Sequence, residues 1–213
     1  MIRHDLDARA LAMGLSALAG YVDAIAFIAS GGYFASFMSG NSTRFAVGLV
    51  DSAGQAAIPA ALIVTFVAGV AGGTVVGHRA GARRRLALLI LVTALLALAA
   101  TLADLRHLWS TAFVMAFAMG AVNAVFERDG ETRVGLTYMT GSLVRIGHGL
   151  AGLILGKRLA GWGAYALLWL SLTLGAIAGA VGYARLGTTA IWLACGWGVA
   201  LTLFVATRMR GAG

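Results

Sequence analysis

Charged side chains are scarce in this chain. Among its 213 residues, 16 are Lys or Arg and 8 are Asp or Glu, so 11% are charged while 60% are hydrophobic. Soluble domains carry about 25% charged residues. The composition therefore excludes an ordinary soluble domain, and a mean hydropathy of +0.88 indicates a membrane protein.

Cysteine and recognisable catalytic patterns are also nearly absent. The one cysteine, Cys195, excludes an internal disulfide and leaves the redox compartment unreadable. His, Cys, Asp and Glu do not recur at metal-ligand spacing, and the sequence has neither a nucleophile elbow nor a phosphate-binding loop. We therefore expect no cofactor, no metal site and no enzymatic activity, with an intramembrane enzyme as a minor alternative.

The net charge of +8 does not indicate a nucleic-acid partner. A basic nucleic-acid-binding face needs a water-exposed surface. Here the basic residues stand at the ends of apolar runs, where inserted membrane proteins keep them. The expected partners are the lipid bilayer and a small molecule or ion.

Long apolar runs follow one another along the chain. About 20 apolar residues suffice to span a bilayer as a helix. The run from Leu86 to Ala103 contains no charged residue. Ala17-Leu18-Ala19 is similar to a signal-peptide cleavage site, but cleavage there would cut into a unit that is repeated later. The expected spans are roughly 10–29, 56–77, 86–103, 109–126, 162–183 and 188–207.

The sequence contains an internal duplication. GYVDA at 20–24 matches GAVNA at 120–124, and MSGNSTR at 38–44 matches MTGSLVR at 139–145. Gly69 matches Gly175 at a slightly larger offset. Matches in the same order indicate two copies of one unit. We assign residues 1–105 to the first copy and 106–213 to the second.

Each copy contains a polar-interrupted segment, 33–50 or 134–156, whose path decides the topology. If both segments cross the membrane there are eight spans; if both enter and return there are six, and the copies are inverted. Cytoplasmic loops collect Lys and Arg. With the N-terminus inside, and with Arg44 and Arg145 set aside, eight spans leave seven of these residues on each side. Six spans place all inside except Arg106 and Arg185.

The expected fold is therefore an all-α integral membrane protein with six transmembrane helices and two re-entrant half-helices in an inverted repeat. Both termini are expected to be cytoplasmic. Non-helical backbone at membrane depth needs protein or a water-lined cavity around it. A half-helix from Ser39 to Val50 would rise about 18 Å, with Ser39 or Asn41 capping its inner end, as Thr140 or Ser142 would in the second copy.

These paired motifs resemble the YoaK-type family of uncharacterised bacterial membrane proteins. The family pattern runs close to G-x-x-D-A…TGN in the first half and G-x-x-N-A…T-x-x-T-G in the second, and this chain has Ser39 where Thr is usual. The resemblance covers nearly the whole chain. It implies a location in the bacterial inner membrane and supplies no substrate.

One acidic residue, Asp23, stands inside an expected span, and its counterpart in the second copy is Asn123. An intramembrane acid is a functional-site hypothesis by default; the alternative is a structural salt bridge between Asp23 and an arginine. Arg44 and Arg145 lie near the inner ends of the half-helices, where they could bind an anionic group or extend to the headgroups.

Small and polar residues complete the candidate substrate site. Hydroxyl and amide groups could contact a substrate or only cap freed backbone, and glycines beside them would let two backbones approach. Gly69 and Gly175 belong to small-residue ridges that could form a homodimer face or pack within one chain. The candidate substrate-binding residues are Asp23, Ser39, Gly40, Asn41, Arg44, Asn123, Thr140, Gly141, Ser142 and Arg145.

The expected function is transport of a small solute, with anions as the candidate class, through a site at the membrane midplane between two inverted repeats. Two alternatives remain open at this point. One is a narrow channel, and the other is a structural or regulatory membrane protein without a solute path.

Overall fold

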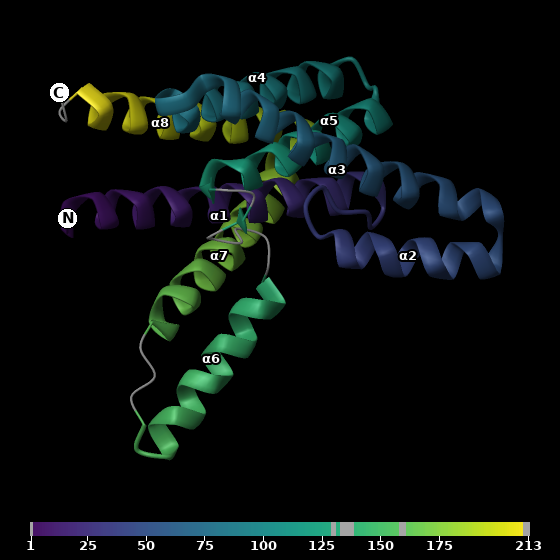
Figure 1. Cartoon of the computed structure of the whole chain (residues 1–213). Helices are drawn as coiled ribbons and strands as arrows, with labels where there is room; N and C mark the ends of the chain where they lie inside the picture. The colour runs from purple at the N-terminus through teal and green to yellow at the C-terminus, as the bar shows by residue number, and fades with distance from the viewer. Residues whose placement is uncertain (1, 129–130, 133–138, 158–160, 211–213) are drawn as a thin grey trace.

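The computed structural model describes residues 2–128, 131–132, 139–157 and 161–210, and these residues are mostly helical (Figure 1). Each expected apolar run lies on one long helix, in two cases together with an adjoining 3₁₀ turn, η2 (Asn123–Phe126) or η3 (Gly187–Ala190). The long helices are α1 (Ile2–Ser30), α3 (Ala53–Ala80), α4 (Arg84–Asp104), α5 (Leu108–Val122), α7 (Trp162–Leu186) and α8 (Ile191–Arg210).

Four helical stretches in the described residues are long and apolar enough to cross a membrane. Two of them, of 51 and 47 residues, each contain a pair of long helices joined by a 3₁₀ turn, namely α3 with α4 and α7 with α8. A single span needs about 20 residues. The lengths of these two stretches therefore accommodate two crossings each.

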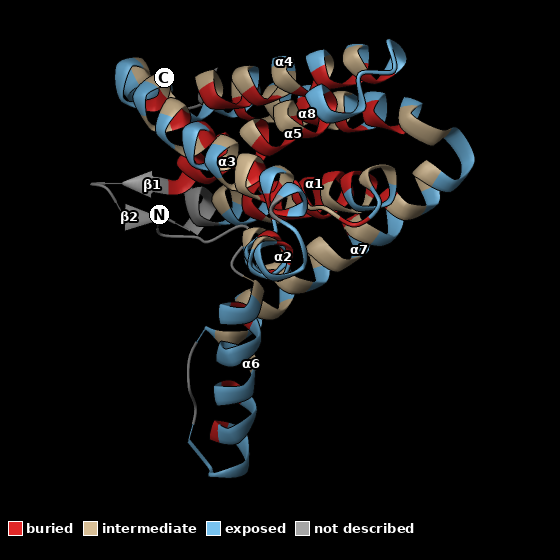
Figure 2. Ribbon diagram, turned by 90° about the vertical axis from the view of Figure 1, so that its right-hand side faces the viewer, coloured by how far each residue is buried: buried red, intermediate tan, exposed pale blue. Residues whose placement is uncertain are grey.

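Two shorter helices form most of the polar-interrupted segments. They are α2 (Met38–Asp51) and α6 (Met139–Ile154). α2 begins one residue before the expected half-helix, and the first residues of the expected segment 134–156 lie outside the described residues. α2 packs on α3 and α6 packs on α7. The α2–α3 pair and the α6–α7 pair leave the bundle in different directions (Figure 1). The surface of α6 is mostly exposed (Figure 2).

Helices from one sequence copy pack mainly against helices from the other copy. α1 packs along α7, and α5 packs along α3, so each pair joins one helix from each copy. α4 and α8 pack on each other. A two-residue antiparallel strand pair, β1 (Glu127–Arg128) with β2 (Glu131–Thr132), follows η2.

Glycines allow these close helix contacts. Gly20 lies against the carbonyl of Leu172, and its counterpart Gly120 lies against the carbonyl of Phe66. Gly175 likewise faces the backbone of α1 at Ala17. Small residues at such crossings let helix backbones pack closely in membranes. Of the two roles expected for the glycine ridges, packing within the chain is therefore present, and a homodimer stays a prediction.

α1 and α5 are the central helices. In the most apolar window of each, 67% of the residues are buried, against 39% for the stretch containing α3 and α4 and 28% for that containing α7 and α8. Leu15, Leu18 and Val22 of α1 are fully buried, as is Leu96 of α4. The middle turns of α1 therefore lie close to the middle of the molecule.

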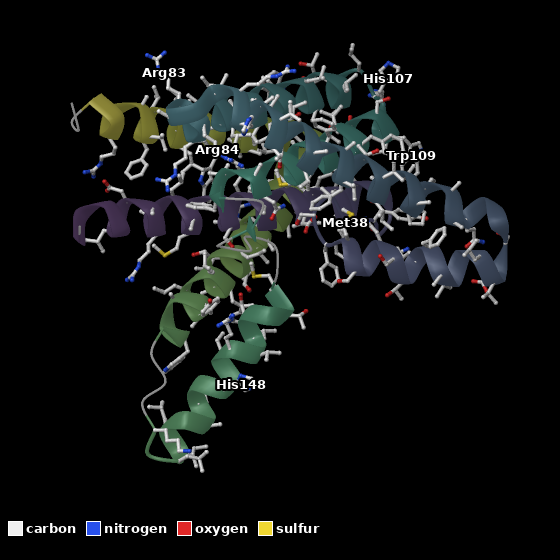
Figure 3. All side chains as sticks on the ribbon, viewed as in Figure 1. Met38, Arg83, Arg84, His107, Trp109 and His148 are labelled. Carbon is white, nitrogen blue, oxygen red and sulfur yellow. The ribbon has the colours of Figure 1, made fainter. Side chains whose placement is uncertain are left out.

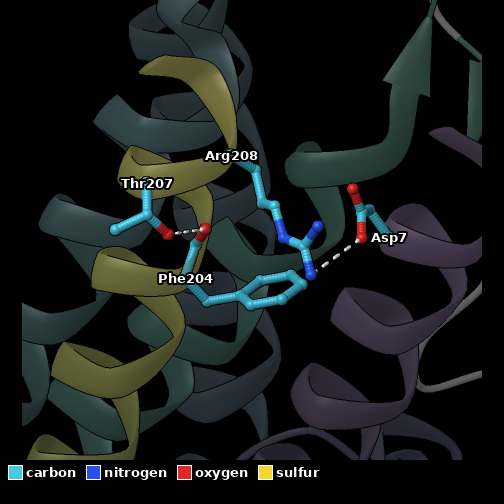
Figure 4. Close-up of polar contacts among 4 residues, drawn as sticks. All are labelled: Asp7, Phe204, Thr207 and Arg208. Carbon is cyan, nitrogen blue, oxygen red and sulfur yellow. Dashed lines mark hydrogen bonds and ion pairs between the residues drawn. The ribbon is translucent and has the colours of Figure 1, made fainter. Parts of the chain in front are cut away.

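The first turns of α1 and the last turns of α8 lie at the same end of the bundle. Asp7 and Arg208 form an ion pair with an N–O distance of 3.6 Å, and the Arg208 guanidinium also stacks 5.4 Å from the ring centroid of Phe204 (Figure 4). Termini at one end require an even number of crossings. Six and eight spans both meet this requirement.

Candidate functional site

The candidate site begins where α1 ends. Gly31 and Gly32 have φ angles of 74° and 116°, a left-handed region that side chains rarely adopt. The Gly32 N–H donates to the Phe27 carbonyl at 2.7 Å. This closing turn stops the helix and sends residues 33–37 back along α1 before α2 begins (Figure 1).

Asp23 holds the returning segment. Its Oδ1 accepts the backbone N–H of Ala35 at 2.8 Å and that of Ser36 at 2.6 Å, and its Oδ2 accepts the Ser36 hydroxyl at 2.6 Å. Because these donors immediately precede α2, the carboxylate lies at the positive end of that helix, where an anion is stabilised. At the N-terminal end of α2, where the sequence allows a bound anion, the negative charge is that of the Asp23 side chain.

The Asn41 side chain binds the backbone of Phe34, the residue before Ala35. The carboxamide of this fully buried side chain accepts the Phe34 N–H at 3.1 Å and donates to the Phe34 carbonyl at 2.8 Å. Ser30 likewise accepts the Tyr33 N–H at 3.0 Å. Side chains therefore satisfy the backbone groups of the non-helical segment, as buried backbone requires.

The expected caps of α2 are partly wrong. The cap position is Phe37, without a side-chain cap hydrogen bond, and Ser39 is exposed. Asn41 acts on the backbone three residues before the cap instead. Gly40 lies under the rings of Phe34 and Phe37, where a side chain would collide with both.

The alternative interpretation of Asp23, a salt bridge with an arginine, is not found among the described residues. The Arg44 guanidinium stacks on the Tyr33 ring, 5.0 Å from its centroid, and Arg145 stacks on the Tyr165 ring at 4.7 Å. Both arginines are exposed. They therefore lie at matching positions of α2 and α6, each on a tyrosine ring, but apart from Asp23.

The remaining candidates of the second copy do not join Asp23. Asn123 is buried in η2 and donates to the Met119 carbonyl at 2.9 Å. Ser142 is buried, whereas Thr140 and Gly141 are exposed on α6. Figure 3 places Met38 where α2 begins and His148 farther out on α6.

A cavity of about 570 Å³ opens beside Asp23. Its walls come from α1, residues 34–37, α7 and the first residue of α6, Met139. Phe37, the residue before α2, and Met139, the first residue of α6, therefore border one cavity. Ser36 and the phenylalanines of this wall were not expected from the sequence, because the chain reversal that brings them to Asp23 has no periodic signal.

A second cavity of about 560 Å³ lies at the ends of α1, α4 and α7. Asp104 and Arg106 line it, and Asp104 accepts the indole N–H of Trp192 at 3.0 Å. Arg106 has a left-handed φ of 62° and closes α4 as a C-terminal cap. Within the described residues, no cluster of three metal-ligating side chains occurs at either cavity.

Comparison with known proteins places these features in a family. The model of the family described as "Protein of unknown function (DUF1275)" matches residues 11–204. The UPF0700 transmembrane protein RA0705 of Rhizobium meliloti (strain 1021) is 42% identical over 185 residues, which cover 86% of this chain and 80% of that protein. No solved structure matches the chain.

Proposed function

Because this chain belongs to the DUF1275 family and is a transmembrane protein, we propose that it carries a small solute across the bacterial inner membrane, with Asp23 at the centre of the path. The observation that carries the proposal is an acidic side chain inside an apolar helix, beside a cavity of about 570 Å³ and a stretch of non-helical backbone.

The depth of Asp23 supports this role. Seven residues of α1 follow it, or about 10 Å of helix, and a bilayer core is about 30 Å thick. Asp23 therefore lies within the apolar part of the helix. A charged group there costs about 3 kcal/mol on insertion scales and marks substrate or proton pathways in many membrane proteins.

The repeated packing supports a symmetric arrangement of the two copies. Gly20 against Leu172 and Gly120 against Phe66 are equivalent contacts made by equivalent residues of the two copies. Transporters built from inverted repeats move one bundle against another around a site near the midplane. In this chain, the helix pairs α1–α7 and α3–α5 are the natural candidates for these two bodies.

Asp23 is also suited to couple the movement to protons or cations. Among the described residues that line the cavity, it is the one titratable side chain. The case for an anionic solute becomes weaker, because Arg44 and Arg145 stack on tyrosines and Asp23 itself occupies the N-terminal end of α2.

One observation favours a second candidate function, a structural membrane protein without a solute path. The hydrogen bonds of the Asp23 carboxylate go to the returning segment, at residues 35 to 37. An anchor for the broken backbone would need the same contacts. Transport and anchoring differ in whether any solute crosses the membrane.

Proteoliposomes that contain a pH-sensitive dye test the proposal. Amines, amino acids, organic acids and purine bases would be added outside vesicles with the wild type, Asp23→Asn or Asp51→Asn. Asp51 is an exposed acid at the end of α2 and serves as the matched control. We expect one solute class to move protons in the wild type and the control but not in Asp23→Asn.

Two other results would contradict the proposal. If no class moves protons although the wild type is monodisperse and inserted, the anchoring function holds. If Asp23→Asn moves protons at the wild-type rate, Asp23 does not couple transport.

A further inference from the structure

The walls of the Asp23 cavity carry charge of one sign. Fourteen described residues line it, and Asp23 is the charged one. The donors that contact its carboxylate are backbone N–H groups of residues 35 to 37 and the Ser36 hydroxyl, all neutral, so they do not cancel its charge. A negative group facing a low-dielectric cavity attracts a cation and repels an anion.

The donors that contact the carboxylate are weaker partners than a cation. Oδ1 accepts two backbone N–H groups and Oδ2 accepts the Ser36 hydroxyl. The backbone N–H of Phe37 also hydrogen-bonds the carboxylate. An N–H donor with a positive charge forms a stronger hydrogen bond with a carboxylate than these neutral donors do.

The rest of the wall is suited to an apolar body. The rings of Phe27 and Phe34 lie 4.9 Å apart by their centroids, and those of Phe34 and Phe37 lie 5.1 Å apart. All three line the cavity together with Leu172 and Ile177 of α7. Aromatic faces attract ammonium groups as well as apolar surface, and a volume of about 570 Å³ is within the range of small-molecule sites.

We propose that this cavity binds a protonated amine with an aromatic or other apolar body, its ammonium on Oδ2 of Asp23 and its body against the three phenylalanine rings. This inference rests on the proposed function and names its solute class. The same oxygen holds either a proton or the ammonium. When Asp23 is protonated, binding of one amine cation to it releases one proton, and in this way the two cations exchange across the membrane.

Three probes that share a phenyl ring test the charge. They are 2-phenylethylammonium, neutral 2-phenylethanol and anionic 3-phenylpropionate, each titrated calorimetrically into the purified full-length protein in detergent. For the wild type and Asp51→Asn, we expect the amine to bind at least tenfold more tightly than the alcohol, and the acid to bind most weakly. For Asp23→Asn, the advantage of the amine should disappear.

Phe37→Leu provides a second variant that keeps the hydrogen bonds of Asp23. The Phe37 side chain is 41% exposed, so the protein should tolerate the change. We expect it to weaken the binding of all three probes by a similar factor and to leave the order of their affinities unchanged.

If a lipid tail is the natural occupant, the alcohol should bind as tightly as the amine, and this result would overturn the inference.

The inference and the proposed function fail in different ways. If the acid binds best, or if another class moves protons in vesicles while no probe binds, the amine class is wrong and transport stands. If no probe binds and no solute moves protons, both are wrong.

Discussion

Gly20 of α1 lies directly against the backbone carbonyl of Leu172 in α7, with no room for a side-chain carbon between them. Gly120 of α5 has the same relationship with Phe66 of α3. In each case the residues belong to different sequence copies. The copies therefore interlock through helix pairs, and neither copy completes its packing alone.

Replacing either glycine should destabilise the protein by a similar amount. Gly20→Ala and Gly120→Ala would each insert a methyl group against backbone, and overpacking of this kind costs about 1–3 kcal/mol. Gly196→Ala is the matched control, because Gly196 of α8 has open space in the same position. Thermal unfolding in detergent should show lower midpoints for the first two variants only. Equal midpoints for all three would contradict the helix crossings.

Asn41→Ala should destabilise the protein strongly. The change leaves the part-buried N–H and carbonyl of Phe34 without the carboxamide that now satisfies both, at about 1–3 kcal/mol for each group. Ser42→Ala is the control, because the exposed Ser42 hydroxyl bonds only its own helix at Met38. We expect the control to change the free energy of unfolding by less than about 0.5 kcal/mol. Chemical denaturation in mixed micelles measures both, and similar losses would exclude a special role for Asn41.

Much of this architecture could be predicted from the sequence because its signals are local. Apolar runs with polar ends determine the long helices, and the polar interruption after residue 33 predicts the break and the start of α2 to within one residue. The family resemblance is confirmed, because the matched motifs extend through nearly the whole chain.

The partners of the polar residues could not be predicted in the same way. Asp23 contacts residues 12 and 13 positions later, through a chain reversal at Gly31 and Gly32 that follows no helical or strand period. Arg145 stacks on Tyr165, which comes from the following helix. Such contacts depend on how helices lie side by side, and the spacing of residues along one helix does not encode this.

The contact between Arg44 and Tyr33 should contribute measurable coupling energy. A cation stacked on an exposed aromatic ring is worth about 0.5–1 kcal/mol. A double-mutant cycle with Arg44→Gln and Tyr33→Leu would measure it from free energies of unfolding. If Arg44 instead extends to the lipid headgroups without touching Tyr33, the two effects would add and the coupling would be zero.

The end of α2 distinguishes six spans from eight. If segment 33–50 is re-entrant, Ser52 is outside the cell and Gly81 is inside; if it crosses, the two positions change sides. Both residues lie at helix junctions. Single cysteines at Ser52 or Gly81, introduced after Cys195→Ala, would be labelled on intact cells with a membrane-impermeant thiol reagent. We expect labelling of Ser52→Cys and protection of Gly81→Cys until the cells are opened. The reverse pattern would require eight spans and parallel copies, and would remove the inverted repeat from the proposed transport mechanism.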